Sequence, residues 1–275
     1  MVGVECTVHL IALLSGASPT DFIKDLESKS SSGSKPYIIK GRPHGWVHKP
    51  HKYNVDQLTG QDWNLFLLSR DPELPAVSND LVTAHISIQV SIPREQYDKF
   101  LSEVGKTPSA IPDTPPLPAE WIKSGGIPPS KVTTTNTTLL KPGELRLDRA
   151  MADFLSDALP PTVSGRPVSL FNLFRYPNGD SKVHEHYMAG FKEKFGPAAG
   201  ARVKFMGPVR SVIGPSGEVE RIPSAWQDAN LVQYDSILHY AYMLSTDVYQ
   251  KLNKEKMEGL EDTCILCVSE AELAG

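Results

Sequence analysis

Histidines are the residues in this sequence best suited to acid–base chemistry near neutral pH, because a free imidazole titrates near pH 6.5. His44 and His48 flank Trp46 in the segment HGWVHKPH. Alternate side chains of an extended chain share one face, so we expect two catalytic imidazoles beside an indole that binds substrate. The alternative is a solvated loop between two strands. We expect no metal site, because a metal needs three or four converging ligands and no carboxylate or cysteine adjoins this segment.

Two more histidines interrupt apolar segments that we expect to be strands. His9 lies within residues 7–14, and His85 lies with Gln89 on the polar side of residues 82–92, which alternate between apolar and polar types. A buried polar group requires a hydrogen-bonding partner. Each histidine is therefore either a bonded structural residue or a catalytic residue in a barrel lumen, where Gln89 would contact the substrate.

The second half of the chain offers an amide, a guanidinium and two phenols. Asn172 interrupts the apolar segment 168–176 and is suited to donating a hydrogen bond to an oxyanion; the alternative is a bond to a neighbouring strand. Arg175 would orient a carboxylate or enolate, and Tyr176 or Tyr234 would donate a proton or line the pocket. The catalytic candidates are His9, His44, His48, His85, Asn172 and Tyr234, and the substrate-binding candidates are Trp46, Trp63, Gln89, Phe171, Arg175 and Tyr176.

Sequence motifs for the common cofactors are absent. The chain contains no glycine-rich phosphate loop, no Gly-x-Ser-x-Gly elbow and no His-Glu-x-x-His pair. Cys264 and Cys267 have the spacing of a redox motif, but residues three apart on a strand point to opposite faces. We therefore expect an enzyme that works without a cofactor.

The composition is that of a globular protein with a small negative charge. Of the 275 residues, 40% are hydrophobic, and 28 Lys and Arg stand against 32 Asp and Glu. This charge does not attract phosphate backbones, so we expect no nucleic-acid partner. The three cysteines do not make a secreted disulfide framework. The longest apolar run near the N-terminus, about seven residues, is too short to span a membrane. These features predict a cytoplasmic protein that does not contact membranes.

The two halves of the chain share an internal repeat. The word QDWNL at residues 61–65 returns as QDANL at residues 227–231, and Gly41 and Gly207 each precede it by 20 residues. Upstream, TVHLIALL aligns with PVSLFNLF, which places His9 opposite Ser169 and Ala12 opposite Asn172. Each copy continues through a turn, a helix and further strands. A shared word, spacing and element order indicate a duplication.

The order of elements in each copy is typical of a ferredoxin-like sandwich, whose sheet carries helices on one face only. Two such sheets can cover their bare faces by closing into one barrel. The predicted fold class is therefore α+β, with two ferredoxin-like repeats forming an intramolecular, pseudo-dimeric α+β barrel. Residues 1–104 are the first, degenerate repeat, residues 105–147 a connector rich in Pro, Thr and Ser, and residues 148–275 the second repeat. The first repeat departs from the pattern because its last helix, at 94–104, follows the final strand.

The second repeat also resembles a known family. The matching residues are FNLFRY at 171–176, Asn178-Gly179, His186-Tyr187-Met188, Gly207-Pro208, Ile213-Gly214-Pro215, Trp226, Asp228 and LVQYDS at 231–236. They are similar to an uncharacterised single-domain family of the dimeric α+β barrel superfamily, which also includes EthD-like and NIPSNAP-like proteins. The resemblance covers about residues 168–268, and Asp235 and His239 depart from it. It implies the barrel fold and leaves the chemistry open, since the superfamily includes decarboxylases, cyclases, cofactor-free monooxygenases, dehydratases and proteins without known activity.

Together these observations predict an enzyme that acts on a hydrophobic small molecule in a barrel lumen. Cyclisation, isomerisation, elimination or decarboxylation, as in the tailoring of secondary metabolites, would need only a shaped pocket and one or two acid–base groups. One alternative is a barrel that binds a small molecule without catalysis, as in a stress response, and another is a cofactor-free monooxygenase. The closed pseudo-dimer predicts a monomer or a weak homodimer.

Overall fold

The computed structural model describes residues 3–29, 37–72, 79–103, 111, 113–134, 143–157, 165–214 and 225–270. Within them, the eight strands form one closed barrel in the order β1-β3-β2-β8-β5-β7-β6-β4, and every neighbouring pair is antiparallel. The strands are β1 (Gly3–Leu13), β2 (Tyr37–His48), β3 (Leu65–Ser69), β4 (Val82–Pro93), β5 (Val168–Arg175), β6 (Ala201–Ile213), β7 (Asp228–Tyr234) and β8 (Asp262–Ser269). The predicted α+β barrel is confirmed.

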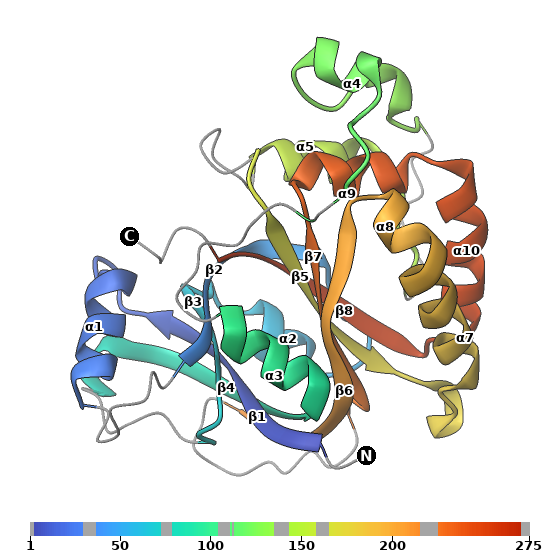
Figure 1. The fold of residues 1–275 in the computed structure, drawn as a ribbon. Helices are drawn as coiled ribbons and strands as arrows, with labels where there is room; N and C mark the ends of the chain where they lie inside the picture. The colour runs from blue at the N-terminus through green and yellow to red at the C-terminus, as the bar shows by residue number, and fades with distance from the viewer. Residues whose placement is uncertain are drawn as a thin grey trace.

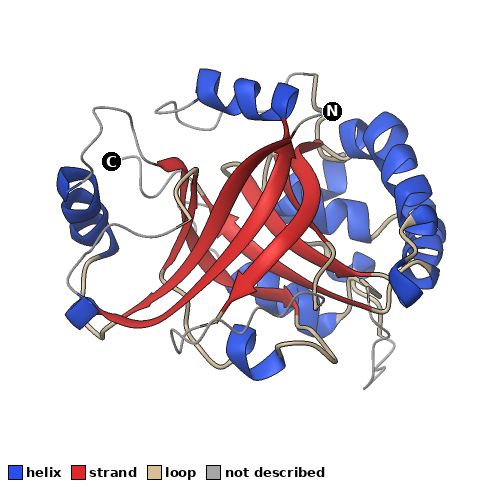
Figure 2. Cartoon of the chain, turned by 90° about the horizontal axis from the view of Figure 1, so that it is seen from below, coloured by secondary structure: helices blue, strands red, loops and turns tan. Residues whose placement is uncertain are grey.

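Each half contributes one ferredoxin-like sheet to the barrel. The first half supplies β4-β1-β3-β2 and the second supplies β8-β5-β7-β6, the same order in both copies. The halves join where β2 pairs with β8 and where β4 pairs with β6. Figure 2 shows the strands crossing at the centre of the molecule, with the helices outside them.

The helices cover the two sheets unequally (Figure 1). In the first half, α1 (Pro19–Lys29) packs on the outer face of the sheet, while α3 (Arg94–Glu103) contacts β1, β4 and β6. In the second half, three helices pack together on the outer face of β5, β7 and β8. They are α7 (Lys182–Gly190), α9 (Ile237–Leu244) and α10 (Asp247–Glu258). The other helical segments are α2 (Val55–Thr59), η1 (Asn79–Leu81), α4 (Ala119–Ser124), η2 (Pro129–Lys131), α5 (Arg149–Asp157), η3 (Pro177–Gly179), a π-helical turn (Phe191–Phe195) and α8 (Gly196–Ala198).

Apolar side chains fill the barrel interior. Phe66 on β3 and Phe171 on β5 touch with ring centroids 5.3 Å apart, although their strands are not neighbours in the barrel. Alternate residues of the other strands join them, including 6, 8, 10 and 12 of β1 and 84, 86, 88, 90 and 92 of β4. The predicted apolar side of β4 therefore faces the interior, and its polar side faces outward. These side chains occupy much of the interior, and the expectation of a substrate-binding lumen stays a prediction.

Strand pairing also corrects the alignment of the two repeats. The words QDWNL and QDANL align Leu65 with Leu231, yet Leu65 packs beneath α1 while Leu231 lies in the interior. Similarly, Ala12 faces the interior whereas Asn172 faces the helices. A shift by an odd number of residues moves a strand's side chains to the other face of the sheet. The residues that the alignment placed opposite one another are therefore not equivalent in space.

Several elements differ in extent from the prediction. The histidine-rich segment around Trp46 is part of β2, because it pairs with β8 of the other half, so the alternative of a loop is wrong. The helix expected over 236–256 is two helices, since Thr246 caps a second one by accepting a hydrogen bond from the backbone N–H of Tyr249. In the connector, the indole ring of Trp121 on α4 is buried against Tyr242.

None of the helices in the described part of the chain combines the length and apolar character needed to cross a membrane.

Candidate functional site

His9 and His85 lie together on the outer face of the first sheet, not in the interior. His9 on β1 is fully buried, and its Nδ1 lies 3.0 Å from Nε2 of His85 on β4. Ser87 Oγ is 3.3 Å from the same Nδ1 and 3.1 Å from His85 Nε2. On its other side, His9 Nε2 contacts the Asp71 carbonyl and Ser69 Oγ, whose own proton goes to that carbonyl.

These contacts determine the protonation of the histidine pair. Both partners of His9 Nε2 are acceptors, so Nε2 carries the proton and Nδ1 accepts one from His85. Burial, together with the charge of His85, lowers the pKa of His9 to about 3, and burial lowers the pKa of His85 to about 4. The pair is neutral near pH 7.

The two imidazoles point at each other and do not converge on a common point. The ring centroids are 5.2 Å apart, and the two facing nitrogens are 3.0 Å apart. The centroids can be this far apart only if both nitrogens lie almost on the line that joins them. This is the geometry of a linear hydrogen bond and not of two ligands on one metal. Among the residues that the structure describes, no group of three or more His, Cys, Asp or Glu side chains is placed to hold a metal.

The predicted cluster of His44, Trp46 and His48 is divided by two irregularities in β2. The register shifts between Pro43 and Gly45 and again between Trp46 and His48. Trp46 packs against the interior, whereas His48 is buried close to Lys256 of α10. Bulges of this kind turn side chains to new directions. The expectation that the three share one face is therefore wrong.

Five other candidates have structural partners away from any common pocket. Trp63 donates from Nε1 to the Leu58 carbonyl at 2.7 Å, and Phe171 lies in the interior. Gln89 accepts from Ser211 Oγ at 2.8 Å. The Arg175 guanidinium lies 5.4 Å from the centre of the Tyr53 ring and pairs with Glu261. Tyr176 donates to the Asp228 carboxylate at 2.7 Å.

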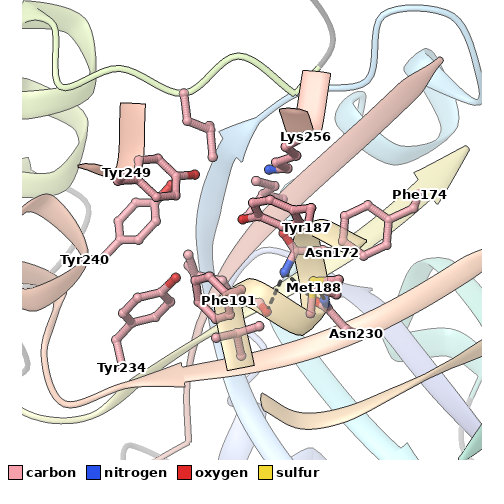
Figure 3. Close-up of a pocket in the computed structure, with 14 residues that line it drawn as sticks. Asn172, Phe174, Tyr187, Met188, Phe191, Asn230, Tyr234, Tyr240, Tyr249 and Lys256 are labelled. Atoms are coloured by element: carbon pink, nitrogen blue, oxygen red, sulfur yellow. Dashed lines mark hydrogen bonds between the residues drawn. The ribbon is translucent and has the colours of Figure 1, made fainter. Parts of the chain in front are cut away.

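Asn172 and Tyr234 line the same cavity, which lies between the second sheet and its helices (Figure 3). Strands β5, β7 and β8 form its floor, and α7, the π-helical turn, α9 and α10 form its walls. The space open to the centres of water molecules is about 30 Å³, enough for about two waters. Its polar lining residues are Asn172, Asn230, Tyr187, Tyr234, Tyr240, Tyr249 and Lys256, and the others are Leu145, Leu170, Phe174, Met188, Phe191, Val232 and Ile265.

The two asparagines form a fixed polar floor. Asn172 Nδ2 donates to Asn230 Oδ1 at 2.8 Å and to the Leu170 carbonyl at 3.0 Å. The sequence alternative for Asn172, a hydrogen bond to a neighbouring strand, is thus present. Because the Nδ2 group is occupied, Asn172 is a positioning group in this arrangement.

The four cavity tyrosines are buried and neutral. Burial raises the pKa of each of them above the usual value of 10.0. Tyr187 and Tyr249 hydrogen-bond to each other, and Tyr234 donates weakly to Met243 Sδ at 3.7 Å. The Tyr240 hydroxyl has no partner among the described residues. Neutral phenols of this kind are proton donors to an oxygen that gains charge.

Lys256 is the cavity's only cation among the lining residues that the structure describes. The residue is 3% exposed, and its Nζ makes no hydrogen bond or ion pair with another residue that the structure describes. Burial lowers the pKa of this amine from its usual 10.5 to about 8. An amine that titrates near neutral pH can act as a base, a nucleophile or a cation that stabilises an oxyanion.

Two imidazoles lie close enough to Lys256 for its charge to act on them. Burial first, and then that charge, lowers the pKa of His48 and of His184 to about 3. His184 is fully buried beside Phe174 and Tyr187, with ring centroids 4.3 and 5.5 Å away. Neither of its ring nitrogens has a partner among the described residues. A buried polar group without a partner is a common feature of functional sites.

Sequence reasoning missed most of this cavity. Tyr187, Tyr240, Tyr249, Lys256 and the neighbouring His184 were not predicted as site residues. One signal was available: Lys256 follows Tyr249 by seven residues and Asn253 by three, so it lies on the buried stripe of α10. A lysine in the apolar stripe of a helix is unusual enough to indicate a functional role.

Comparison with known proteins gives no family assignment. No family model matches the chain, and no curated protein matches it in sequence. Two crystal structures are similar, each described as a "putative monooxygenase". The one from Lactobacillus acidophilus NCFM has 8% identity and a TM-score of 0.41, with 96% of this chain and 92% of that chain covered. The one from Fusobacterium nucleatum subsp. nucleatum has 9% identity and a TM-score of 0.43, with 98% and 94% covered. We base the fold assignment on the strand order and barrel closure of the protein itself.

Proposed function

We propose that this protein is an enzyme that transfers protons at carbon next to a carbonyl group of a small, largely apolar molecule. The reaction takes place between the second sheet and its helices, not in the barrel lumen. The observation that carries this proposal is the buried Lys256 amine, which lines a cavity whose other polar groups are phenols and carboxamides. The proposal requires no cofactor.

Each polar group has a role that its environment supports. The neutral amine of Lys256 accepts the proton from carbon, since its lowered pKa leaves about half of it unprotonated near pH 8. The Tyr187 and Tyr249 hydroxyls donate to the carbonyl oxygen as it becomes an enolate. The hydrogen-bonded pair of Asn172 and Asn230 holds the floor of the cavity in place. Cyclisation, isomerisation, elimination and decarboxylation next to a carbonyl group can each pass through such an enolate.

The π-helical turn offers a way to admit a substrate. The cavity holds about two waters, so a larger molecule must displace side chains. Phe191, which begins the π-helical turn, lines the cavity. Turns of this type occur frequently at functional sites and mark places where a helix is less regular. Movement of Phe191 would enlarge the cavity without disturbing the barrel.

A non-catalytic binding protein is the second candidate, and the small size of the cavity favours it. In that case the polar groups would hold a ligand but would not move its protons. The two candidates differ in proton exchange, which can be measured without knowing the natural substrate.

Exchange of carbon-bound hydrogen with solvent tests the proposal. Small ketones such as acetone are incubated with the protein in D₂O, and loss of the proton signal next to the carbonyl is followed by NMR. We expect exchange above the buffer rate that falls at least 10-fold in Tyr249→Phe, by loss of one oxyanion donor. The matched control is Tyr97→Phe on α3 of the first half, which should keep the full rate. Exchange at the buffer rate, combined with ligand-dependent thermal stabilisation, would instead identify a binding protein.

A further inference from the structure

Lys256 differs from the other buried lysine in the described part of the chain. Lys204 on β6 is also largely buried, but its Nζ lies 2.7 Å from the Glu270 carboxylate. The Lys204 ammonium is therefore already engaged in an ion pair. Lys256 has no recorded carboxylate partner within the described residues, and its side chain faces a cavity. A desolvated lysine in an apolar pocket is the form of this residue that attacks carbonyl carbon.

The neighbours of Lys256 supply the remaining requirements of carbonyl addition. Tyr187 of α7 and Tyr249 of α10 present hydroxyls that can protonate the carbonyl oxygen. His184 of α7 and His48 of β2 are neutral imidazoles near the amine, and His184 has two nitrogens without partners among the described residues. The four groups come from three separate elements. Lys256 itself lies in the last turn of α10, where its stem is held by packing.

We propose that Lys256 forms an imine with small aldehydes and ketones that enter this cavity. The inference rests on the proposed function, because it uses the same cavity, and it names the substrate class as simple carbonyl compounds. The size of the cavity restricts the first ligands to a few heavy atoms.

The chemistry balances within the groups present. The neutral amine of Lys256 adds to the carbonyl carbon, and the carbonyl oxygen takes a proton from the Tyr187–Tyr249 pair. The extra proton on the nitrogen then returns to this pair, which leaves a neutral carbinolamine. The pair next protonates the leaving hydroxyl, so that one water departs and a protonated carbon–nitrogen double bond forms, whose N–H proton restores the phenol at the end. No oxidant or reductant is consumed. The protonated imine then makes the adjacent carbon–hydrogen bond more acidic, which connects the imine to the proposed proton transfer.

Reductive trapping tests the inference directly on the full chain. The protein is incubated at pH 8 with propanal or acetone and sodium cyanoborohydride, which reduces an imine to a stable secondary amine. The modified lysine is then located by mass spectrometry of peptides. At this pH the neutral fraction of Lys256 is roughly 100-fold that of an exposed lysine with a pKa of 10.5, so we expect Lys256 to be modified first.

Two substitutions sharpen the result. Lys256→Met should abolish the early modification, whereas Lys254→Met, at an exposed position two residues earlier, should leave it unchanged. The wild-type peptide map decides the question even if Lys256→Met does not fold. Modification spread over exposed lysines, with none preferred at Lys256, would overturn the inference.

The outcome is separable from that of the proposed function. If acetone exchanges its protons and Tyr249→Phe slows the exchange, but no adduct forms on Lys256, then proton transfer stands and the imine falls. If neither exchange nor an adduct is seen, both proposals fall.

Discussion

Replacing Lys256 by methionine should make the protein more stable at neutral pH. The folded chain buries this amine and lowers its pKa from the usual 10.5 to about 8, so folding opposes its charge. At about 1.4 kcal/mol per pH unit, the lowering corresponds to about 3 kcal/mol of lost stability. Methionine has a similar length and no charge, so Lys256→Met should recover most of that amount.

The gain should depend on pH in a defined direction. Between pH 8 and 10.5 the unfolded chain binds more protons at this site than the folded chain, so wild-type stability should rise with pH across that window. Below pH 8 the penalty is constant. The difference between Lys256→Met and wild type should therefore be largest at pH 7 and fall to about 0.4 kcal/mol at pH 10.5, where the folded state holds a neutral amine and half of the unfolded chains do.

Urea unfolding followed by circular dichroism measures this difference. The experiment is run at pH 7, 9 and 10.5 on wild type, Lys256→Met and the surface control Lys254→Met. Comparing variants at each pH cancels the contribution of the tyrosines, which the three proteins share. If Lys256→Met were less stable than wild type at pH 7, Lys256 would be a paired structural cation, and the reasoning behind the cavity would be refuted.

Three further predictions concern the rest of the molecule. His9 and His85 have pKa values lowered to about 3 and 4, so stability should be lost as pH falls from 6.5 toward 4. In urea unfolding over that range, His9→Gln should reduce the pH slope by up to about 1.4 kcal/mol per pH unit. Tyr176→Phe removes the hydroxyl bonded to the partly buried Asp228 carboxylate and should cost about 1–3 kcal/mol by urea unfolding. An unchanged midpoint would mean that water replaces the phenol. Phe66→Ala should cost about 3–5 kcal/mol yet leave ketone exchange per folded molecule unchanged, because its side chain faces the interior; a parallel loss of exchange would return the site to the lumen.

The sequence was sufficient to predict the fold because its signals are local and repeated. Alternation along 82–92, the repeated word at 61–65 and 227–231, and the glycine spacing all concern the order of elements. That order, with two copies of a half-covered sheet, leaves few ways to bury the bare faces. Strand pairing within each half and barrel closure follow from it.

The candidate site was predicted only in part, and the reason is geometric. Asn172 and Tyr234 were predicted as site residues and do line the cavity, whereas His9 and His85 bond to each other in the other half. The histidines were placed in the lumen because polarity in an apolar strand shows that a residue needs a partner, but not on which face the partner lies. Bulges within β2 separated Trp46 from His48 in the same way.

Element order and the alternation of β4 were determined by the sequence itself, since each depends on neighbouring residues that can be read directly. Which face of each strand is inside, and which side chains meet, was decided only by the tertiary structure. A shift of one residue reverses the faces of a strand, and pairing between distant strands sets that shift. Lys256 shows the consequence. In the sequence it is one charged residue near the end of a helix, and only the fold brings His48 of β2 and His184 and Tyr187 of α7 close to it.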